Sequence, residues 1–181
     1  MSALTVLRAT EFAAAKHRHQ RRKDHHASPY VNHPVTVALL LAEVAGVSDH
    51  EVLAAALLHD TLEDTDTTAE ELESAFSPKV RALVEEVTDD KRLPKAERKR
   101  LQIEHATHLS PDAALIKIAD KIANVLDVTH SPPSDWSLDR RLEYLDWAAA
   151  VVQGCPVASE ALLGRFKEVL AEGRRVLVAT G

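Results

Sequence analysis

Residues 57–68, LLHDTLEDTDTT, place a histidine and several carboxylates directly behind two leucines. Charged groups that are taken out of water cost several kcal/mol unless they are paired or bind a metal. His59 and Glu63 are four residues apart. Asp60 and Asp64 repeat that spacing, so a helix that continues through them stacks both pairs over one turn. This pattern indicates a site for chemistry rather than for packing.

Two further polar residues stand out from apolar surroundings. Asp120 lies in ALIKIADKIANVLDV, whose apolar spacing predicts a helix buried on most sides, and His33 lies before a proline that starts a helix. Each residue alone is weak evidence, because a lone buried aspartate is more often a cap or an ion-pair partner than a ligand. Together, two imidazoles and two carboxylates on three helices suit a divalent metal such as manganese, iron or zinc. The candidate metal ligands are His33, His59, Asp60 and Asp120.

The chemistry of such a centre is hydrolysis. Four protein ligands leave room for water, and a metal lowers the pKa of bound water from about 16 toward 7. Glu63 and Asp64, one turn beyond the ligands, are placed to orient that water or to take its proton. We therefore predict that these two carboxylates are the catalytic pair.

The elements that must position these residues are helices. Ser48 and Glu51 form a capping box, S-x-x-E, and Thr68 with Glu71 repeats it. With five glycines and no strand-like alternation, the chain is predicted to be all-α. Helices are expected at about 3–20 and 34–46, after caps at Ser48, Thr68, Ser77 and Ser110, and at about 137–153 and 157–174.

Composition limits the class of protein. A chain of 181 residues that is 45% apolar suits one domain, spanning 1–181, and a single cysteine excludes an internal disulfide framework. The N-terminus lacks the apolar core of a signal peptide, and no apolar run approaches the roughly 20 residues of a membrane span. A net charge of -6 disfavours nucleic-acid binding. We expect a cytoplasmic protein with no membrane or nucleic-acid partner.

These motifs resemble a known family. The spacing of the candidate ligands reproduces the H…HD…D signature of the HD-domain metal-dependent phosphohydrolases. The segments RRKDHHASPYVNHP, ALLHDTLEDTDTT, VRALVEEVTDDKRLPKAERKR and LIKIADKIANVLD resemble the hydrolase domain of the RelA/SpoT proteins. The nearest likeness is to their stand-alone small version, the metazoan SpoT homolog type of small alarmone hydrolase, and it runs over about residues 9–152. The resemblance implies an HD-domain helical bundle.

The resemblance also implies an activity. Such enzymes remove pyrophosphate from the 3′ position of the alarmones ppGpp and pppGpp, leaving GDP or GTP, and use Mn²⁺. The family's metal ligands fall on the four candidates given above, and its acidic catalytic pair falls on Glu63 and Asp64. Its nucleotide contacts correspond to Arg22, Lys23, Tyr30, Lys117, Asn124 and Arg140.

Two basic segments give support that does not depend on the resemblance. KHRHQRRK at 16–23 and KRLPKAERKR at 91–100 stand out in an acidic chain, and a substrate with two diphosphates needs such compensation. Basic residues on helix surfaces are usually only solvated. Arg22 and Lys23 are the better candidates, because they lie in the loop that leads to the first metal ligand.

Two positions depart from the family pattern. The loop before the Ser/Thr-Pro-Tyr motif commonly contains glycine in the family, where this chain has Ala27. The position before Asn124 is often a histidine or an aromatic residue, and here it is Ala123, which favours a larger pocket.

Two rival functions stay open. The metal centre alone does not choose the leaving group, so an HD phosphatase of another nucleotide, such as a deoxynucleotide or NADPH, is an alternative. A degenerate HD domain that binds an alarmone without cleaving it is the other. Glu63 and Asp64 argue against the binding module, because such a protein does not need them.

Overall fold

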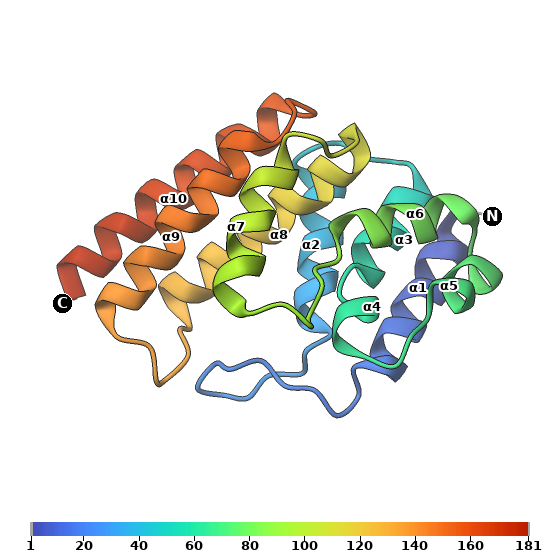
Figure 1. The fold of residues 1–181 in the computed structure, drawn as a ribbon, viewed down its shortest axis with the longest axis horizontal. Helices are drawn as coiled ribbons and strands as arrows, with labels where there is room; N and C mark the ends of the chain where they lie inside the picture. Colours follow the sequence, from blue (N-terminus) through green and yellow to red (C-terminus); the bar gives the residue numbers. More distant parts are fainter. Residues whose placement is uncertain (1, 181) are drawn as a thin grey trace.

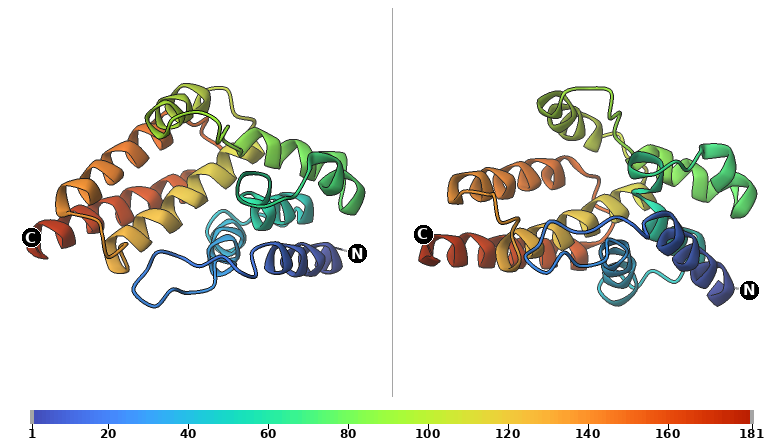
Figure 2. Two further views of the ribbon diagram at one scale, coloured as in Figure 1. Left: turned by 60° about the horizontal axis from the view of Figure 1, so that its bottom comes forward. Right: turned by 90° about the horizontal axis from the view of Figure 1, so that it is seen from below.

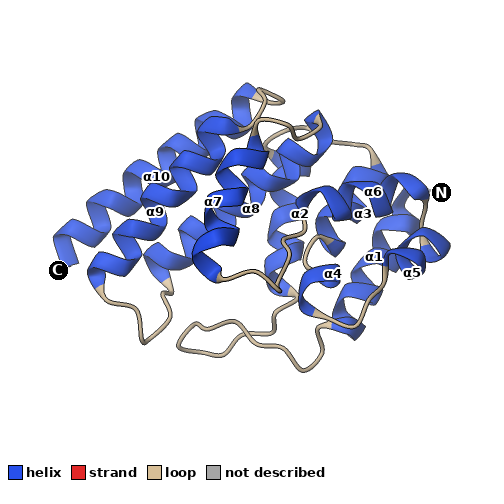
Figure 3. Ribbon diagram, viewed as in Figure 1, coloured by secondary structure: helices blue, strands red, loops and turns tan. Residues whose placement is uncertain are grey.

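The computed structural model describes residues 2–180, which form a bundle of helices (Figure 1). The helices are α1 (Ser2–Lys16), α2 (Asn32–Glu43), α3 (His50–Leu58), α4 (Thr61–Asp64), α5 (Ala69–Ala75), α6 (Pro78–Val87), α7 (Lys95–Ala106), α8 (Pro111–His130), α9 (Leu138–Gly154) and α10 (Glu160–Thr180). Figure 3 shows no strand within this range, and pairing of extended backbone is limited to an isolated bridge between Arg21 and Pro29. The all-α prediction is confirmed. Within residues 2–180 no helix combines the length and the apolarity that crossing a membrane requires.

Helix α8 lies at the centre of the bundle. It packs against α2 and α6 on one side and against α9 and α10 on the other, and Figure 1 shows α8, α9 and α10 side by side. Thirteen of its residues are buried, because apolar side chains occupy most directions around its axis. The predicted burial on most sides is confirmed. Asp120 is therefore held on a rigid element in the interior.

Three of the predicted caps are confirmed. The side chains of Thr68, Ser77 and Ser110 accept hydrogen bonds from backbone N–H groups in the first turns of α5, α6 and α8. Proline follows Ser77 and Ser110 at the first helical position, where its missing N–H costs nothing. These caps fix where the central helices begin.

The predicted capping box at Ser48 is wrong. Helix α3 begins at His50, one residue later than that box requires, and Asp49 is the cap, accepting from the backbone N–H of Glu51 at 2.9 Å. Aspartate caps helices at least as well as serine, so local sequence does not separate the two choices. The shift of one residue changes where α3 begins.

Helix α7 was not predicted from the sequence. Its sequence, KAERKRLQIEHA, is mostly charged and gives little apolar periodicity. It packs on α9, where Trp147 Nε1 donates to the carbonyl oxygen of Lys99 at 3.0 Å. Figure 2 shows α7 lying to one side of α8 and α9. The contact with Trp147 therefore helps to stabilise a helix that its own apolar pattern does not predict.

Several helix ends also differ from expectation, and α2 covers Asn32–Glu43 in place of 34–46. Helix α1 ends at Lys16, before the expected 20, and α10 covers Glu160–Thr180 in place of 157–174. Helix α3 ends at Leu58 and is followed by a turn before the short α4. Helix ends of this kind are set by local hydrogen bonding, which apolar spacing does not report.

Candidate active site

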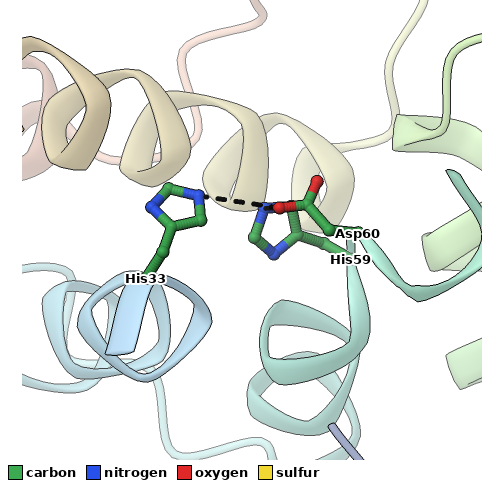
Figure 4. A group of neighbouring side chains, drawn as sticks. All are labelled: His33, His59 and Asp60. Atoms are coloured by element: carbon green, nitrogen blue, oxygen red, sulfur yellow. Dashed lines mark ion pairs between the residues drawn. The ribbon is translucent and has the colours of Figure 1, made fainter. Parts of the chain in front are cut away.

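His33, His59 and Asp60 come together from two helices. His33 projects from the first turn of α2, whereas His59 and Asp60 follow the end of α3. His59 Nε2 lies 3.1 Å from Asp60 Oδ2, and His33 Nε2 lies 3.8 Å from the same oxygen. One ligand atom from each residue lies within 4.8 Å of the others, and Figure 4 shows the His33 ring pointing toward the other two side chains. This is the spacing that a single ion requires.

Asp120 reaches the same cluster from α8. Its Oδ1 atom lies 3.1 Å from His33 Nε2 and 3.7 Å from His59 Nε2. Asn124 Nδ2 donates to Oδ1 at 2.6 Å and Lys121 Nζ donates to Oδ2 at 3.0 Å, which orient the carboxylate. The structure thus brings all four candidate ligands together, and we name His33, His59, Asp60 and Asp120 the HD cluster.

The HD cluster has the donor chemistry of a metal site. His59 Nδ1 donates to the carbonyl oxygen of Ala56 at 2.8 Å, which fixes the ring and leaves Nε2 directed at the carboxylates. Burial opposes a charge on His59, but Asp60 and Asp120 raise the pKa of the imidazole to about 10. A metal at Nε2 needs the neutral imidazole, so it competes with a proton for that nitrogen. Binding of a metal must displace that proton, so affinity is expected to rise with pH.

Glu63 and Asp64 lie on α4, directly after the cluster. The backbone N–H of Asp64 bonds to Asp60 O at 2.9 Å, so one helical turn is kept although α3 has ended. Glu63 Oε1 lies 3.3 Å from Arg98 Nη1, and Asp64 pairs with Lys91. Both cations come from the basic segment at 91–100, which contacts the two predicted catalytic carboxylates.

The pKa of Glu63 is raised to about 7, first by burial and then by the negative charge of Asp60. Because the folded-state pKa lies above the unfolded one, protonated Glu63 favours folding at low pH and this contribution is lost as pH rises through about 7. In the presence of a chelator, Glu63→Gln is expected to raise the free energy of unfolding by roughly 2–3 kcal/mol at pH 8 and by less than about 1 kcal/mol at pH 5. Urea unfolding at both pH values measures this difference. The exposed Glu11→Gln is the matched control, and an equal effect of Glu63→Gln at both pH values contradicts the raised pKa.

A pocket of about 340 Å³ opens beside the cluster. Its walls come from the loop after α1, the C-terminal half of α8, the segment that joins α8 to α9, and single residues of α4 and α9. It contains one catalytic candidate, four of the predicted nucleotide contacts and two aromatic rings: Asp64, Arg22, Lys23, Tyr30, Asn124, Trp136 and Tyr144. Asp24 and Asp127 also line this pocket and offset part of its positive charge. Its size, its aromatic rings and the cations Arg22 and Lys23 suit a nucleotide.

Arg22 and Tyr30 connect the pocket to the HD cluster. Arg22 Nη2 donates to Asn124 Oδ1 at 3.2 Å and pairs with Asp127. The guanidinium carbon Cζ of Arg22 lies 5.6 Å from the centre of the Tyr30 ring. The Tyr30 hydroxyl donates to Asp60 Oδ2 at 2.5 Å. A ligand held by Arg22 is therefore close to the cluster.

Lys117 and Arg140 lie outside this pocket. Lys117 is buried, and its Nζ donates to the carbonyl oxygen of Val87 at 2.8 Å. Arg140 stacks on Trp136 at 4.5 Å and lines a neighbouring pocket of about 360 Å³ together with Lys95 and Lys99. Their predicted contact with nucleotide stays a prediction.

Several pocket residues were not individually predicted from the sequence, although Gln20 and Lys95 lie in the two basic segments. Gln20, Trp136 and Tyr144 line the main pocket, and Lys95 lines the neighbouring one, which shares both rings. Trp136 and Tyr144 were detectable in principle, because the chain has only two tryptophans and two tyrosines. Gln20 gives no signal of its own within the basic segment at 16–23.

The two departures from the family pattern lie at the loop and the cluster. Ala27 has a φ of 49°, the left-handed conformation that glycine adopts without strain, so the loop keeps a glycine-like shape without glycine. Ala123 is buried and lines a separate cavity of about 190 Å³ beside His33. Room for a larger ligand group at Ala123 stays a prediction.

Comparison with known proteins identifies the class. A family model described as HD domain matches residues 9–145, and the chain belongs to the HD-domain family. It is 55% identical over 170 residues to the human protein named guanosine-3′,5′-bis(diphosphate) 3′-pyrophosphohydrolase MESH1, a match that covers 92% of this chain and 95% of that one. A protein of Aquifex aeolicus (strain VF5) with the same enzymatic name is 46% identical over 126 residues, covering 66% of this chain and 17% of that one.

A solved structure shows the same likeness in three dimensions. It is described as a metazoan ortholog of SpoT that hydrolyzes ppGpp, and it matches with a TM-score of 0.90 and 45% sequence identity over 93% of this chain and 94% of that one. The resemblance to the stand-alone branch of the RelA/SpoT hydrolases is confirmed, as is the HD-domain bundle. Membership of this family together with the HD cluster implies a divalent metal.

Proposed function

We propose that the chain is a metal-dependent guanosine-3′,5′-bis(diphosphate) 3′-pyrophosphohydrolase that converts ppGpp to GDP and pppGpp to GTP, releasing pyrophosphate. The proposal rests on the HD cluster, which lies beside a pocket lined by Arg22, Lys23 and aromatic rings. The names and the extent of the matched relatives support it. Incubation of ppGpp with the protein and Mn²⁺, with identification of the products, tests it.

We propose that the HD cluster holds Mn²⁺. Two imidazoles and two carboxylates form an intermediate ligand set, neither the all-oxygen set that magnesium prefers nor a thiolate set. When bound, the ion supplies hydroxide at neutral pH and neutralises phosphate charge. The hydrogen bonds of His59 to Ala56 and of Asp120 to Asn124 keep the ligands oriented.

We propose that Glu63 and Asp64 handle the proton of the attacking water. Water adds to the 3′-linked phosphorus, the bond from that phosphorus to the ribose 3′ oxygen breaks, and pyrophosphate leaves. The pair takes up the proton that the water loses, and the 3′ oxygen of the product gains a proton in turn. The pKa of Glu63, about 7, suits exchange of a proton near neutral pH.

Arg22, Lys23, Tyr30 and Asn124 are proposed to hold the nucleotide, since they line the pocket beside the cluster. Arg140, with Lys95 and Lys99, is proposed to extend this basic surface into the neighbouring pocket. We further propose that the chain acts as one domain, because α8 packs against helices from both halves of the sequence. Its cytoplasmic location stays an expectation from the sequence. Its partner is then the small nucleotide, not nucleic acid or membrane.

Lys23→Ala is expected to raise the KM for ppGpp about tenfold or more, because a charge-assisted contact to phosphate contributes roughly 1.5–3 kcal/mol. Arg22→Ala is expected to act in the same direction. The metal content of both variants should match that of the unsubstituted protein, because neither side chain belongs to the HD cluster. Initial rates at varied ppGpp, with metal analysis, measure both quantities.

The control for these variants is Arg18→Ala, which removes an exposed cation from the same basic segment outside the pocket. Its KM should stay within about twofold of the original, since exposed charges contribute little. If the KM of Lys23→Ala equals that of the control, Lys23 does not contact the substrate.

A further inference from the structure

We propose that His17 and Gln20 are positioning residues for Asp64: the His17 imidazole fixes the Gln20 amide, and that amide holds the carboxylate. The inference rests on the proposed function, in which Asp64 is catalytic. It adds two residues that neither touch the metal site nor carry charge themselves in this role. Their part is to set the direction of a group that does the chemistry.

The three side chains form one chain of hydrogen bonds. His17 follows the last turn of α1, where its backbone N–H bonds to Ala13 O at 2.9 Å, and it is 2% exposed. His17 Nδ1 lies 2.7 Å from Gln20 Oε1. Gln20 Nε2 donates to Asp64 Oδ2 at 3.1 Å. A buried residue of α1 is thus connected to a carboxylate of α4 through one amide.

The chemistry of the acceptors fixes which group donates in each of these hydrogen bonds. An ionised carboxylate only accepts hydrogen bonds, so Gln20 must present its NH₂ group to Asp64. Its carbonyl oxygen then faces His17, and Nδ1 of the imidazole must carry the proton. Within residues 2–180 the other ring nitrogen, Nε2, has no hydrogen-bond partner, so the polar contact of the ring is with Gln20. His17 therefore determines that the NH₂ group of Gln20, and not its oxygen, points toward Asp64.

The second oxygen of Asp64 is held less firmly. Its partner is Lys91, whose side chain is 48% exposed, whereas the Asp64 side chain is 17% exposed. A flexible exposed lysine restrains a carboxylate weakly, because solvent competes and side-chain entropy is lost. Gln20 is the part-buried, neutral restraint, and its backbone is fixed by the bond from Tyr30 N–H to Gln20 O at 3.2 Å.

His17 also supports the HD cluster. Its ring lies against the Tyr30 ring, with centroids 4.8 Å apart and planes inclined by 34°. The Tyr30 hydroxyl in turn donates to Asp60 Oδ2 at 2.5 Å. His17 thus packs behind Tyr30, which contacts the candidate metal ligand Asp60. His17 also orients the Gln20 amide, which contacts Asp64. Substitutions that keep the ring separate these two roles.

The first experiment uses His17→Phe, which keeps an aromatic ring against Tyr30 but removes the Nδ1 donor. Freed from His17, the Gln20 amide is able to turn its oxygen toward Asp64 and misplace the carboxylate. With Mn²⁺-loaded protein and ppGpp we expect kcat to fall about tenfold, the size of one hydrogen bond, with KM within about twofold. Gln20→Leu should have the same effect. Unchanged kcat in both variants overturns the proposal.

The double variant His17→Phe/Gln20→Leu separates positioning from general loss of stability. If His17 acts through Gln20, kcat of the double variant equals that of Gln20→Leu alone. Independent structural damage instead multiplies the two losses, which contradicts the proposal. Thr10→Val, which removes another part-buried polar group from α1, is the control and should leave kcat unchanged.

A readout without turnover keeps this inference distinct from the proposed function. Nitrogen chemical shifts of the His17 ring report which nitrogen carries the proton. We expect the Nδ1–H form in the original protein and loss of that preference in Gln20→Leu. An Nε2–H form in the original protein overturns the inference even if ppGpp is cleaved. Failure to cleave ppGpp with the Nδ1–H form present counts against the proposed function alone.

Discussion

His59→Ala and Asp120→Ala are expected to abolish metal binding and to lower ppGpp hydrolysis by about 10³-fold or more. Each removes a ligand from a set of four, and the stabilisation that a metal gives to developing charge amounts to several kcal/mol. Metal analysis after treatment with chelator and reloading with Mn²⁺ measures occupancy. Pyrophosphate release from the same samples measures turnover.

Stability is the control on this experiment. Removing Asp120 leaves buried Lys121 without its carboxylate partner, so loss of activity alone does not prove loss of a ligand. Thermal unfolding shows whether each variant is folded. His130→Ala removes an exposed histidine from the end of α8 and should keep both metal and activity. Full metal occupancy in both cluster variants rules out these residues as ligands.

Glu63→Gln and Asp64→Asn are expected to lower turnover by about 10²-fold or more while metal and nucleotide still bind. Both substitutions keep the shape of the side chain and remove the charge that takes a proton from water. Single-turnover rates, together with equilibrium binding of ppGpp to the Mn²⁺-loaded variants, separate chemistry from affinity.

Asp66→Asn is the matched control for this pair, because it removes a nearby carboxylate whose side chain is 88% exposed. Its turnover should stay close to that of the original protein. Near-normal turnover in both Glu63→Gln and Asp64→Asn assigns the pair a structural role instead. Failure of both variants to bind ppGpp contradicts the separation of catalysis from binding.

The residues of the HD cluster were accessible from the sequence for a physical reason. A polar residue inside an apolar helix, such as Asp120, has an energetic cost that only a partner or a function explains. His59 and Asp60 follow an apolar helix in the same way. The number and chemistry of these polar residues in apolar surroundings indicate a common site. Helix α8 was predictable because its periodicity is strong.

The remaining features depend on contacts between distant segments. Helix α7 has a charged sequence and packs on α9 through Trp147, which local spacing does not report. Lys117 corresponds to a nucleotide contact in the family, yet its Nζ donates to Val87 O, because a long side chain reaches whichever acceptor the fold supplies. Gln20 bonds to Asp64 across 44 positions of sequence. No pattern within a single helix contains that information.

The most direct measurement is the identity of the products formed from ppGpp by the Mn²⁺-loaded protein, with GTP, a deoxynucleoside triphosphate and NADPH as comparison substrates. We predict GDP and pyrophosphate, because attack falls on the 3′-linked phosphorus and the 5′-diphosphate stays intact. GTP lacks a 3′-phosphoryl group and should be a poor substrate. Equal hydrolysis of GTP and ppGpp, a product that keeps the 3′-diphosphate, or a clear preference for NADPH with release of its 2′-phosphate would contradict the assignment.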